Sequence, residues 1–185
     1  MGRIVSLMAA TLPWPGMTEQ PFHPNADELL ANNAAYVEQF SDHGLGVRPR
    51  RQLAIVACMD SRMDIFEMLG LEHGEAHIIR NAGGVVTDDV IRSLVLSQRR
   101  LGTREIILIH HTNCGLEGVS VDEFKQELEQ ECGIRPWWAL EAFLDPYDDV
   151  RQSINRLRLS PFVKHKDHIR GFVYDVNDGL LHEVL

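Results

Sequence analysis

The stretch LAIVACMDSR, residues 53–62, decides the fold of this chain. It opens on a continuous apolar run that includes β-branched side chains, and such a run is typical of a strand covered on both faces. A thiol, an acid and a guanidinium follow at once, as Cys58, Asp60 and Arg62. This order predicts a buried strand whose carboxyl end carries polar chemistry.

Strand and helix patterns alternate after this stretch. Further strands are predicted at 76–80 and 105–110, and helices at 63–70, 88–101, 121–132 and 145–159. Such alternation implies a parallel sheet with helices packed against it. The last segment, 170–184, has two apolar runs about an Asn-Asp-Gly turn and predicts a strand pair. The predicted fold class is α/β, with a mostly parallel central sheet flanked by helices and a C-terminal strand pair.

The segment before the first strand is predicted to form an arm and a helix. Residues 1–25 are rich in proline and lack periodicity, so we expect a flexible N-terminal arm. Residues 25–40, NADELLANNAAYVEQF, place their apolar side chains on one broad face of a helix. We therefore expect an N-terminal helical arm, and residues 26–185 are predicted to form a single domain.

Composition excludes several classes of partner. The chain has 185 residues and a net charge of −9, which argues against a nucleic-acid surface and weakly favours a small-molecule substrate. No apolar segment is long enough to span a bilayer, so no membrane partner is expected. The three cysteines are an odd number and cannot all pair in disulfides. With unpaired thiols and no export signal, we expect a cytoplasmic protein.

A second polar cluster, HHTNCG at 110–115, follows the third predicted strand. Ligands of parallel sheets bind beyond the carboxyl ends of the strands. His111 and Cys114 are spaced so that one turn presents both to a metal, and Cys58 joins them if the first and third strands are neighbours. Three protein ligands with a fourth position open are typical of a catalytic zinc. Two thiolates and an imidazole favour zinc over magnesium, calcium or manganese.

Other histidines and the third cysteine are given structural roles. His110 should point to the opposite face of its strand from His111, as a packing residue or a support for the metal site. His73 and His77 flank a turn and are predicted to be surface residues. Cys132 ends an amphipathic helix without other polar ligands nearby, and we interpret it as structural.

Asp60 and Arg62 lie beside the predicted metal ligand Cys58. The carboxylate either binds the metal or accepts a hydrogen bond from its water. The guanidinium of Arg62 is well shaped to grip that carboxylate with two charge-assisted hydrogen bonds. The alternative is a surface ion pair, which contributes little to stability, but its position beside the predicted metal argues against this.

These motifs resemble a known family. CMDSR at 58–62 followed by HTNCG at 111–115 resembles the signature of the beta-class carbonic anhydrases. RNAGG at 80–84 and GFVYDVNDGLL at 171–181 resemble further segments of that family, and the likeness covers about 27–184. The chain is most similar to the short bacterial branch, which also contains carbonyl sulfide hydrolases.

The resemblance implies a set of site residues. One zinc ion per chain would be held by Cys58, His111 and Cys114, next to a catalytic dyad of Asp60 and Arg62. In some members the aspartate that matches Asp60 becomes a fourth zinc ligand at low pH, so Asp60 is assigned both roles. The resemblance also implies a homodimer in which the N-terminal helix lies across the partner subunit, with tetramers built from such dimers.

The function implied is the reversible hydration of carbon dioxide to bicarbonate and a proton. Zinc-bound hydroxide would attack the carbon of CO₂, Asp60 would accept the hydrogen of that hydroxide, and Arg62 would hold Asp60 off the metal. Backbone amides near Gly83 or Gly115 are candidates for placing the substrate.

Two alternatives stay open at this point. The same zinc site would also serve a carbonyl sulfide or carbon disulfide hydrolase that releases sulfide. A non-catalytic zinc protein or bicarbonate sensor is the other alternative, although such a protein needs neither Asp60 nor Arg62.

Overall fold

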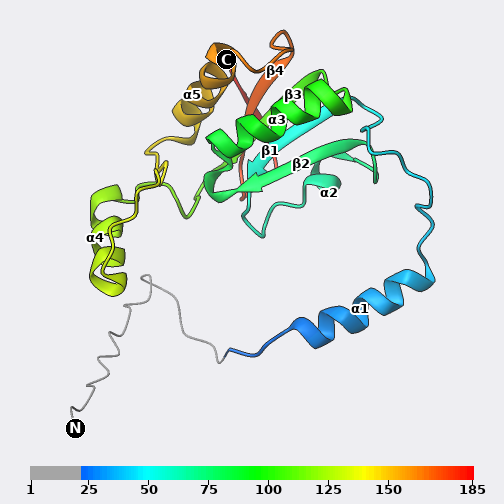
Figure 1. The fold of residues 1–185 in the computed structure, drawn as a ribbon, viewed down its shortest axis with the longest axis horizontal. Helices are drawn as coiled ribbons and strands as arrows, with labels where there is room; N and C mark the ends of the chain where they lie inside the picture. The colour runs from blue at the N-terminus through cyan, green and yellow to red at the C-terminus, as the bar shows by residue number, and fades with distance from the viewer. Residues whose placement is uncertain (1–21) are drawn as a thin grey trace.

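The computed structural model describes residues 22–185 and contains one five-stranded sheet in the order β2-β1-β3-β4-β5 (Figure 1). The strands are β1 (Leu53–Cys58), β2 (Ala76–Asn81), β3 (Glu105–His111), β4 (Ile169–Tyr174) and β5 (Leu181–Val184). β1 to β4 pair in parallel, and β5 runs antiparallel to β4. The predicted fold class, including the C-terminal strand pair, is confirmed.

Several of the helices begin or end at residues that cap them. The helices are α1 (Ala26–Glu38), α2 (Ile65–Leu69), α3 (Asp88–Leu101), α4 (Val121–Cys132) and α5 (Pro146–Leu159), with a 3₁₀ turn, η1, at Ala82–Gly84. The side chain of Asp145 accepts a hydrogen bond from the backbone of Tyr147, and Pro146 occupies the first turn of α5. Gly70 and Gly133 end α2 and α4 in the left-handed conformation that favours glycine.

The first strand is buried along its whole length, as its apolar run predicts. Ala54 and Val56 pack on one side, in a core that contains residues of α3 and α5. Ile55 and Ala57 pack on the other side, in a second core that includes Ile65 of α2. Because helices cover both faces, the only polar chemistry of this strand emerges at its carboxyl end.

The turn η1 lies against that carboxyl end. Gly84 has φ of +73°, and a Cβ atom there would lie 2.8 Å from the backbone nitrogen of Cys58 and 3.0 Å from the carbonyl oxygen of Ile109. Glycine is therefore required at position 84 for two reasons: the backbone has positive φ there, and the backbones of β1 and β3 lie too close to leave room for a side chain.

We expect Gly84→Ala to destabilise the protein by roughly 3 kcal/mol, because backbone strain and steric overlap add at this position. Gly102→Ala is the matched control, since Gly102 also has positive φ, +84°, but has nothing within 4 Å of a new Cβ. That control should cost only about 1 kcal/mol. Urea unfolding measures both values, and equal losses would contradict the packing argument.

Two helices stand away from the sheet (Figure 1). No residue of α1 or of α4 is buried. Four apolar side chains of α1 are more than two-fifths exposed: Leu29, Leu30, Tyr36 and Val37. The predicted arm at residues 1–25 lies outside the described residues except for its last four positions. Among residues 22–185, no helix is both long and apolar enough to cross a bilayer.

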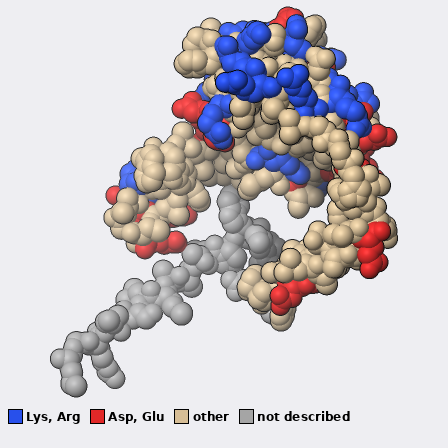
Figure 2. All heavy atoms as spheres, turned by 45° about the vertical axis from the view of Figure 1, so that its right-hand side comes forward, with Lys and Arg blue, Asp and Glu red and all other residues tan. Residues whose placement is uncertain are grey.

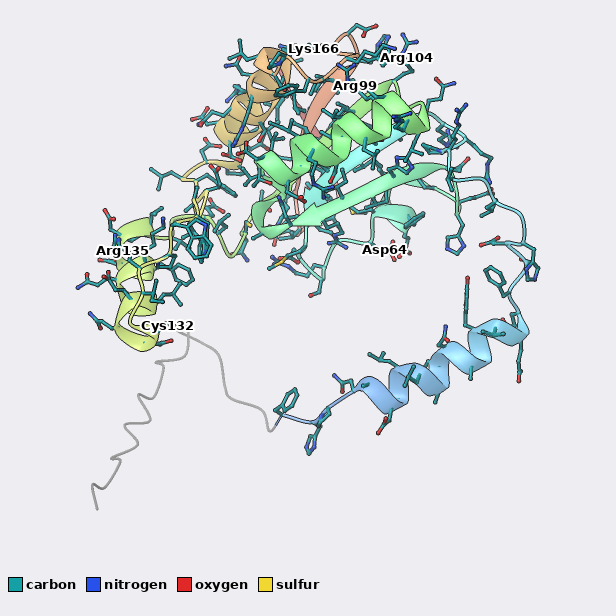
Figure 3. The ribbon with its side chains drawn as sticks, viewed as in Figure 1. Asp64, Arg99, Arg104, Cys132, Arg135 and Lys166 are labelled. Atoms are coloured by element: carbon teal, nitrogen blue, oxygen red, sulfur yellow. The ribbon has the colours of Figure 1, made fainter. Side chains whose placement is uncertain are left out.

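Cationic side chains gather at one end of the molecule (Figure 2). Arg99, Arg104 and Lys166 lie there, around the end of α3 and the start of β4 (Figure 3). Arg104 directly precedes β3, so this cluster sits at the amino edge of the sheet, opposite the predicted metal site. The net charge of −9 did not reveal this local clustering.

Candidate metal centre

The parallel pairing of β1 with β3 brings the two polar clusters together. Ala57 pairs with Ile109, so both strands end at the same edge of the sheet. Cys58, His111 and Cys114 are buried there, and their ligand atoms all lie within 4.8 Å of one another. The two sulfur atoms are 3.9 Å apart. The structure thus brings together the three residues that the spacing of the motifs selected.

The imidazole of His111 is oriented for binding a metal. Its Nδ1 lies 2.9 Å from the carbonyl oxygen of Thr112, so Nδ1 carries the proton and donates it to that carbonyl. Nε2 is then an acceptor, and it is buried without a hydrogen-bond partner among the described residues. A buried acceptor with no donor is costly unless a cation fills the place.

The two thiol groups are in contact, and each shifts the pKa of the other. The contact with Cys114 lowers the pKa of Cys58 to about 4, against the opposing effect of burial. The contact with Cys58 raises the pKa of Cys114, and burial acts in the same direction. The contact thus favours the thiolate form of Cys58, and a divalent cation would favour the thiolate form of both sulfurs.

The donor set fits zinc. Two sulfurs and one imidazole nitrogen form a soft set that suits zinc and does not suit calcium or magnesium. Three protein ligands leave one tetrahedral position open, as in catalytic zinc sites.

Asp60 and Arg62 form a two-pronged ion pair next to these ligands. Arg62 Nε lies 2.9 Å from Asp60 Oδ1, and Nη2 lies 2.7 Å from Oδ2. The hydrogen bonds from the Arg62 side chain, and then from its backbone N–H, hold the pKa of Asp60 well below its usual range. Oδ2 of the same carboxylate lies 3.7 Å from His111 Nε2. The ion pair thus places a carboxylate that favours its charged form beside the three candidate ligands.

Arg62 also ties the two polar loops together. Its Nη2 donates to the carbonyl oxygen of Asn113 at 2.9 Å. Asn113 adopts φ of +54°, a left-handed conformation that asparagine tolerates better than most residues. Sequence reasoning did not select Asn113, although an asparagine inside a predicted turn is a usable signal for this conformation.

His110, next to His111 on β3, is held by a residue that sequence analysis did not identify. His110 points to the opposite face from His111, as predicted, and its Nε2 lies 2.6 Å from Asp149 Oδ2 on α5. Asp149 lies 39 residues further along the chain, and no local pattern marks it as a partner.

Two predictions about other residues were wrong. His77 is half-buried, not on the surface, because its Nδ1 lies 2.8 Å from the hydroxyl of Ser97 on α3. Cys132 is exposed and packs in no core of the described chain. It lies at the far end of α4 (Figure 3). His73 is exposed, as predicted, and pairs with Asp42.

Comparison with known proteins places this geometry in a family. Residues 53–144 match the carbonic anhydrase family. The chain is 54% identical over 158 residues to Beta-carbonic anhydrase 1 of Mycobacterium tuberculosis, which covers 85% of this chain and 96% of that protein. It is 30% identical over 158 residues to a carbon disulfide hydrolase of Acidithiobacillus thiooxidans, which covers 74% of this chain and 79% of that protein.

A solved structure gives the same result. The carbonic anhydrase of Streptococcus mutans superposes with a TM-score of 0.83 at 40% identity, covering 89% of this chain and 100% of that chain. The likeness therefore extends over the sheet and its helices and is not confined to the two short motifs. This chain belongs to the beta-carbonic anhydrase family, a family of zinc-dependent enzymes.

Proposed function

We propose that this chain catalyses the reversible hydration of carbon dioxide to bicarbonate and a proton, with one zinc ion held by Cys58, His111 and Cys114. One observation carries the proposal: three buried soft donors lie beside a carboxylate that Arg62 keeps ionised. A purely structural zinc site needs no such carboxylate, so the Asp60–Arg62 pair argues against a non-catalytic protein.

The zinc would supply a Lewis acid that lowers the pKa of water to about 7, a value known for carbonic anhydrases themselves. The side chains of the protein would orient the reacting water. Asp60 accepts a hydrogen bond from the reacting water and directs its lone pair, because its carboxylate is charged and rigidly held. Arg62 uses both carboxylate oxygens of Asp60 and so keeps that residue away from the metal. If Arg62 releases it, Asp60 is near enough to the donor set to act as a fourth ligand.

Activity should rise with pH. Because Arg62 depresses the pKa of Asp60, that carboxylate stays charged above about pH 4 and adds no step to the profile near neutrality. The step must then come from deprotonation of the water. We expect kcat/KM for CO₂ to increase by about tenfold per pH unit below the water pKa and to level off above it. A rate that is flat from about pH 6 to 9 would contradict this mechanism.

A second candidate function keeps the site and changes the substrate. The relative from Acidithiobacillus thiooxidans is named a carbon disulfide hydrolase, so carbonyl sulfide or carbon disulfide is an alternative substrate here. CO₂ hydration and sulfide release, measured on one zinc-quantified sample, separate the two functions. Fast CO₂ turnover without sulfide release supports the anhydrase, and the reverse result supports the hydrolase.

We also propose that the chain forms a homodimer, from which tetramers would be built, in which α1 lies across the partner subunit. Within residues 22–185, the apolar face of α1 contacts no core. We assign residues 26–185 to a single zinc-binding domain that follows the arm at 1–25. The buried thiols of the site must stay reduced to bind zinc, which supports a location in the cytoplasm.

Val37→Glu should dissociate the dimer, because it places a charge on the apolar face of α1. Ala35→Glu is the matched control: it adds the same charge at another exposed position, on the opposite side of the helix. Sedimentation velocity distinguishes the variants. If the Val37 variant sediments like the wild type while the wild type is dimeric, α1 does not form the interface.

A further inference from the structure

A second arginine holds the backbone of the metal centre. Arg80, on β2, donates through Nε to the carbonyl oxygen of Cys58 at 2.8 Å and through Nη2 to the carbonyl oxygen of Asp60 at 2.6 Å. Its own backbone is fixed, because it pairs with Ala57 in the parallel ladder between β1 and β2. One guanidinium therefore grips the segment that runs from the first sulfur ligand to the charged carboxylate.

This segment needs such support. The pairing of β1 with β3 ends at Ala57, one residue before Cys58. Two backbone hydrogen bonds follow Cys58. The N–H of Met59 donates to the carbonyl oxygen of Asn81 at 2.8 Å, and the N–H of Met63 donates to the carbonyl oxygen of Asp60 at 3.1 Å. Arg80 adds two charge-assisted hydrogen bonds to these, and such bonds are stronger than neutral ones.

The two arginines act on different parts of Asp60. Arg62 holds the carboxylate, and Arg80 holds the main-chain carbonyl of the same residue. Neither contact replaces the other. If the backbone of Asp60 moves, its carboxylate moves too, even while Arg62 holds it.

We infer that Arg80 is a positioning residue of the metal centre, which fixes the backbone of Cys58 and Asp60 so that sulfur and carboxylate keep their places relative to His111 and Cys114. Its effect on turnover rests on the proposed function. Its effects on the loop and on metal coordination do not, because they follow from the hydrogen bonds alone.

Three variants test this inference. Arg80→Gln removes the guanidinium, Arg80→Lys keeps the charge but not the two-pronged geometry, and Arg92→Gln is the control. Arg92 is exposed, and among residues 22–185 its side chain pairs only with Asp89, within α3. Each variant would be measured as the cobalt(II)-substituted protein by visible absorption, as the metal-free protein by amide hydrogen exchange at Met59 and Met63, and as the zinc protein by CO₂ hydration.

We expect Arg80→Gln to shift the cobalt absorption bands and to speed exchange at Met59 and Met63 by about tenfold or more. Turnover should fall by about 10–100-fold, the range for residues that orient metal ligands, mainly in kcat. Arg80→Lys should lie between the wild type and the glutamine variant, and Arg92→Gln should match the wild type.

A wild-type cobalt spectrum and wild-type exchange in Arg80→Gln would overturn the inference. If that variant fails to fold, the lysine variant decides: an intermediate spectrum supports the inference, and an unchanged one overturns it. If the wild-type zinc protein shows no CO₂ turnover while the cobalt and exchange effects appear, the proposed function fails and the positioning role of Arg80 stands.

Discussion

Replacing Cys58 with serine is expected to remove zinc and to lower CO₂ turnover by at least about 100-fold, while the fold remains. Losing a residue that merely orients a metal ligand costs 10–100-fold, and losing the ligand itself should cost at least the upper end of that range. Serine is similar in size and offers a hydroxyl that stays protonated near neutral pH. The buried site would then keep one thiolate and one imidazole, which is too few for a stable zinc site.

Metal analysis and stopped-flow CO₂ hydration measure the two effects, and circular dichroism checks the fold. Cys132→Ser is the matched control, because it makes the same chemical change at an exposed cysteine on α4, outside the metal cluster. It should bind one zinc per chain and turn over like the wild type. A Cys58→Ser protein with full zinc and full activity would contradict the assignment of the metal ligands.

The second large effect is expected for Asp60→Asn, which should keep its zinc yet lose about 100-fold or more in kcat. Asparagine is nearly the same shape, but it is neutral, so its contacts with Arg62 lose the attraction between two opposite charges. A carboxamide also presents a donor where the carboxylate presented only acceptors. The reacting water would then meet a weaker acceptor in a less rigid position.

Asp64→Asn is the matched control for this change. Asp64 lies four residues away and caps α2 by accepting hydrogen bonds from the backbone of Phe66 and Glu67, and asparagine caps helices about as well as aspartate. Figure 3 shows Asp64 beside that helix. The control should retain its activity. Equal kcat values for wild type and Asp60→Asn, at equal zinc content, would show that Asp60 takes no part in the reaction.

The fold could be predicted from sequence because its signals are local. The apolar run at 53–57 marks a strand buried on both sides, and glycines mark the ends of α2 and α4. The exposure of α1 could not be predicted from its pattern. An apolar helical face indicates burial, but not whether the covering surface belongs to the same chain or to a partner.

The clustering of the three candidate metal ligands could be predicted because their chemistry is concentrated at two strand ends. Cys58 and His111 required only that β1 and β3 be neighbours. The supporting residues required contacts that sequence does not display. Arg80 donates to the carbonyl oxygens of Cys58, the last residue of β1, and of Asp60, just beyond it. Asp149 contacts His110 from α5. Every residue type has the same backbone carbonyl group. A side chain that binds a backbone carbonyl therefore does not require a particular amino acid at the partner position, and the sequence shows no sign of the contact.

Zinc titration of the metal-stripped protein, followed by stopped-flow CO₂ hydration at pH 8.5, tests whether one zinc ion per chain is what makes the protein hydrate CO₂. We predict negligible turnover without metal, a linear rise as zinc is added, and a sharp break at one zinc per chain. Full turnover in the stripped protein would contradict the account, and so would negligible CO₂ turnover once each chain holds its zinc.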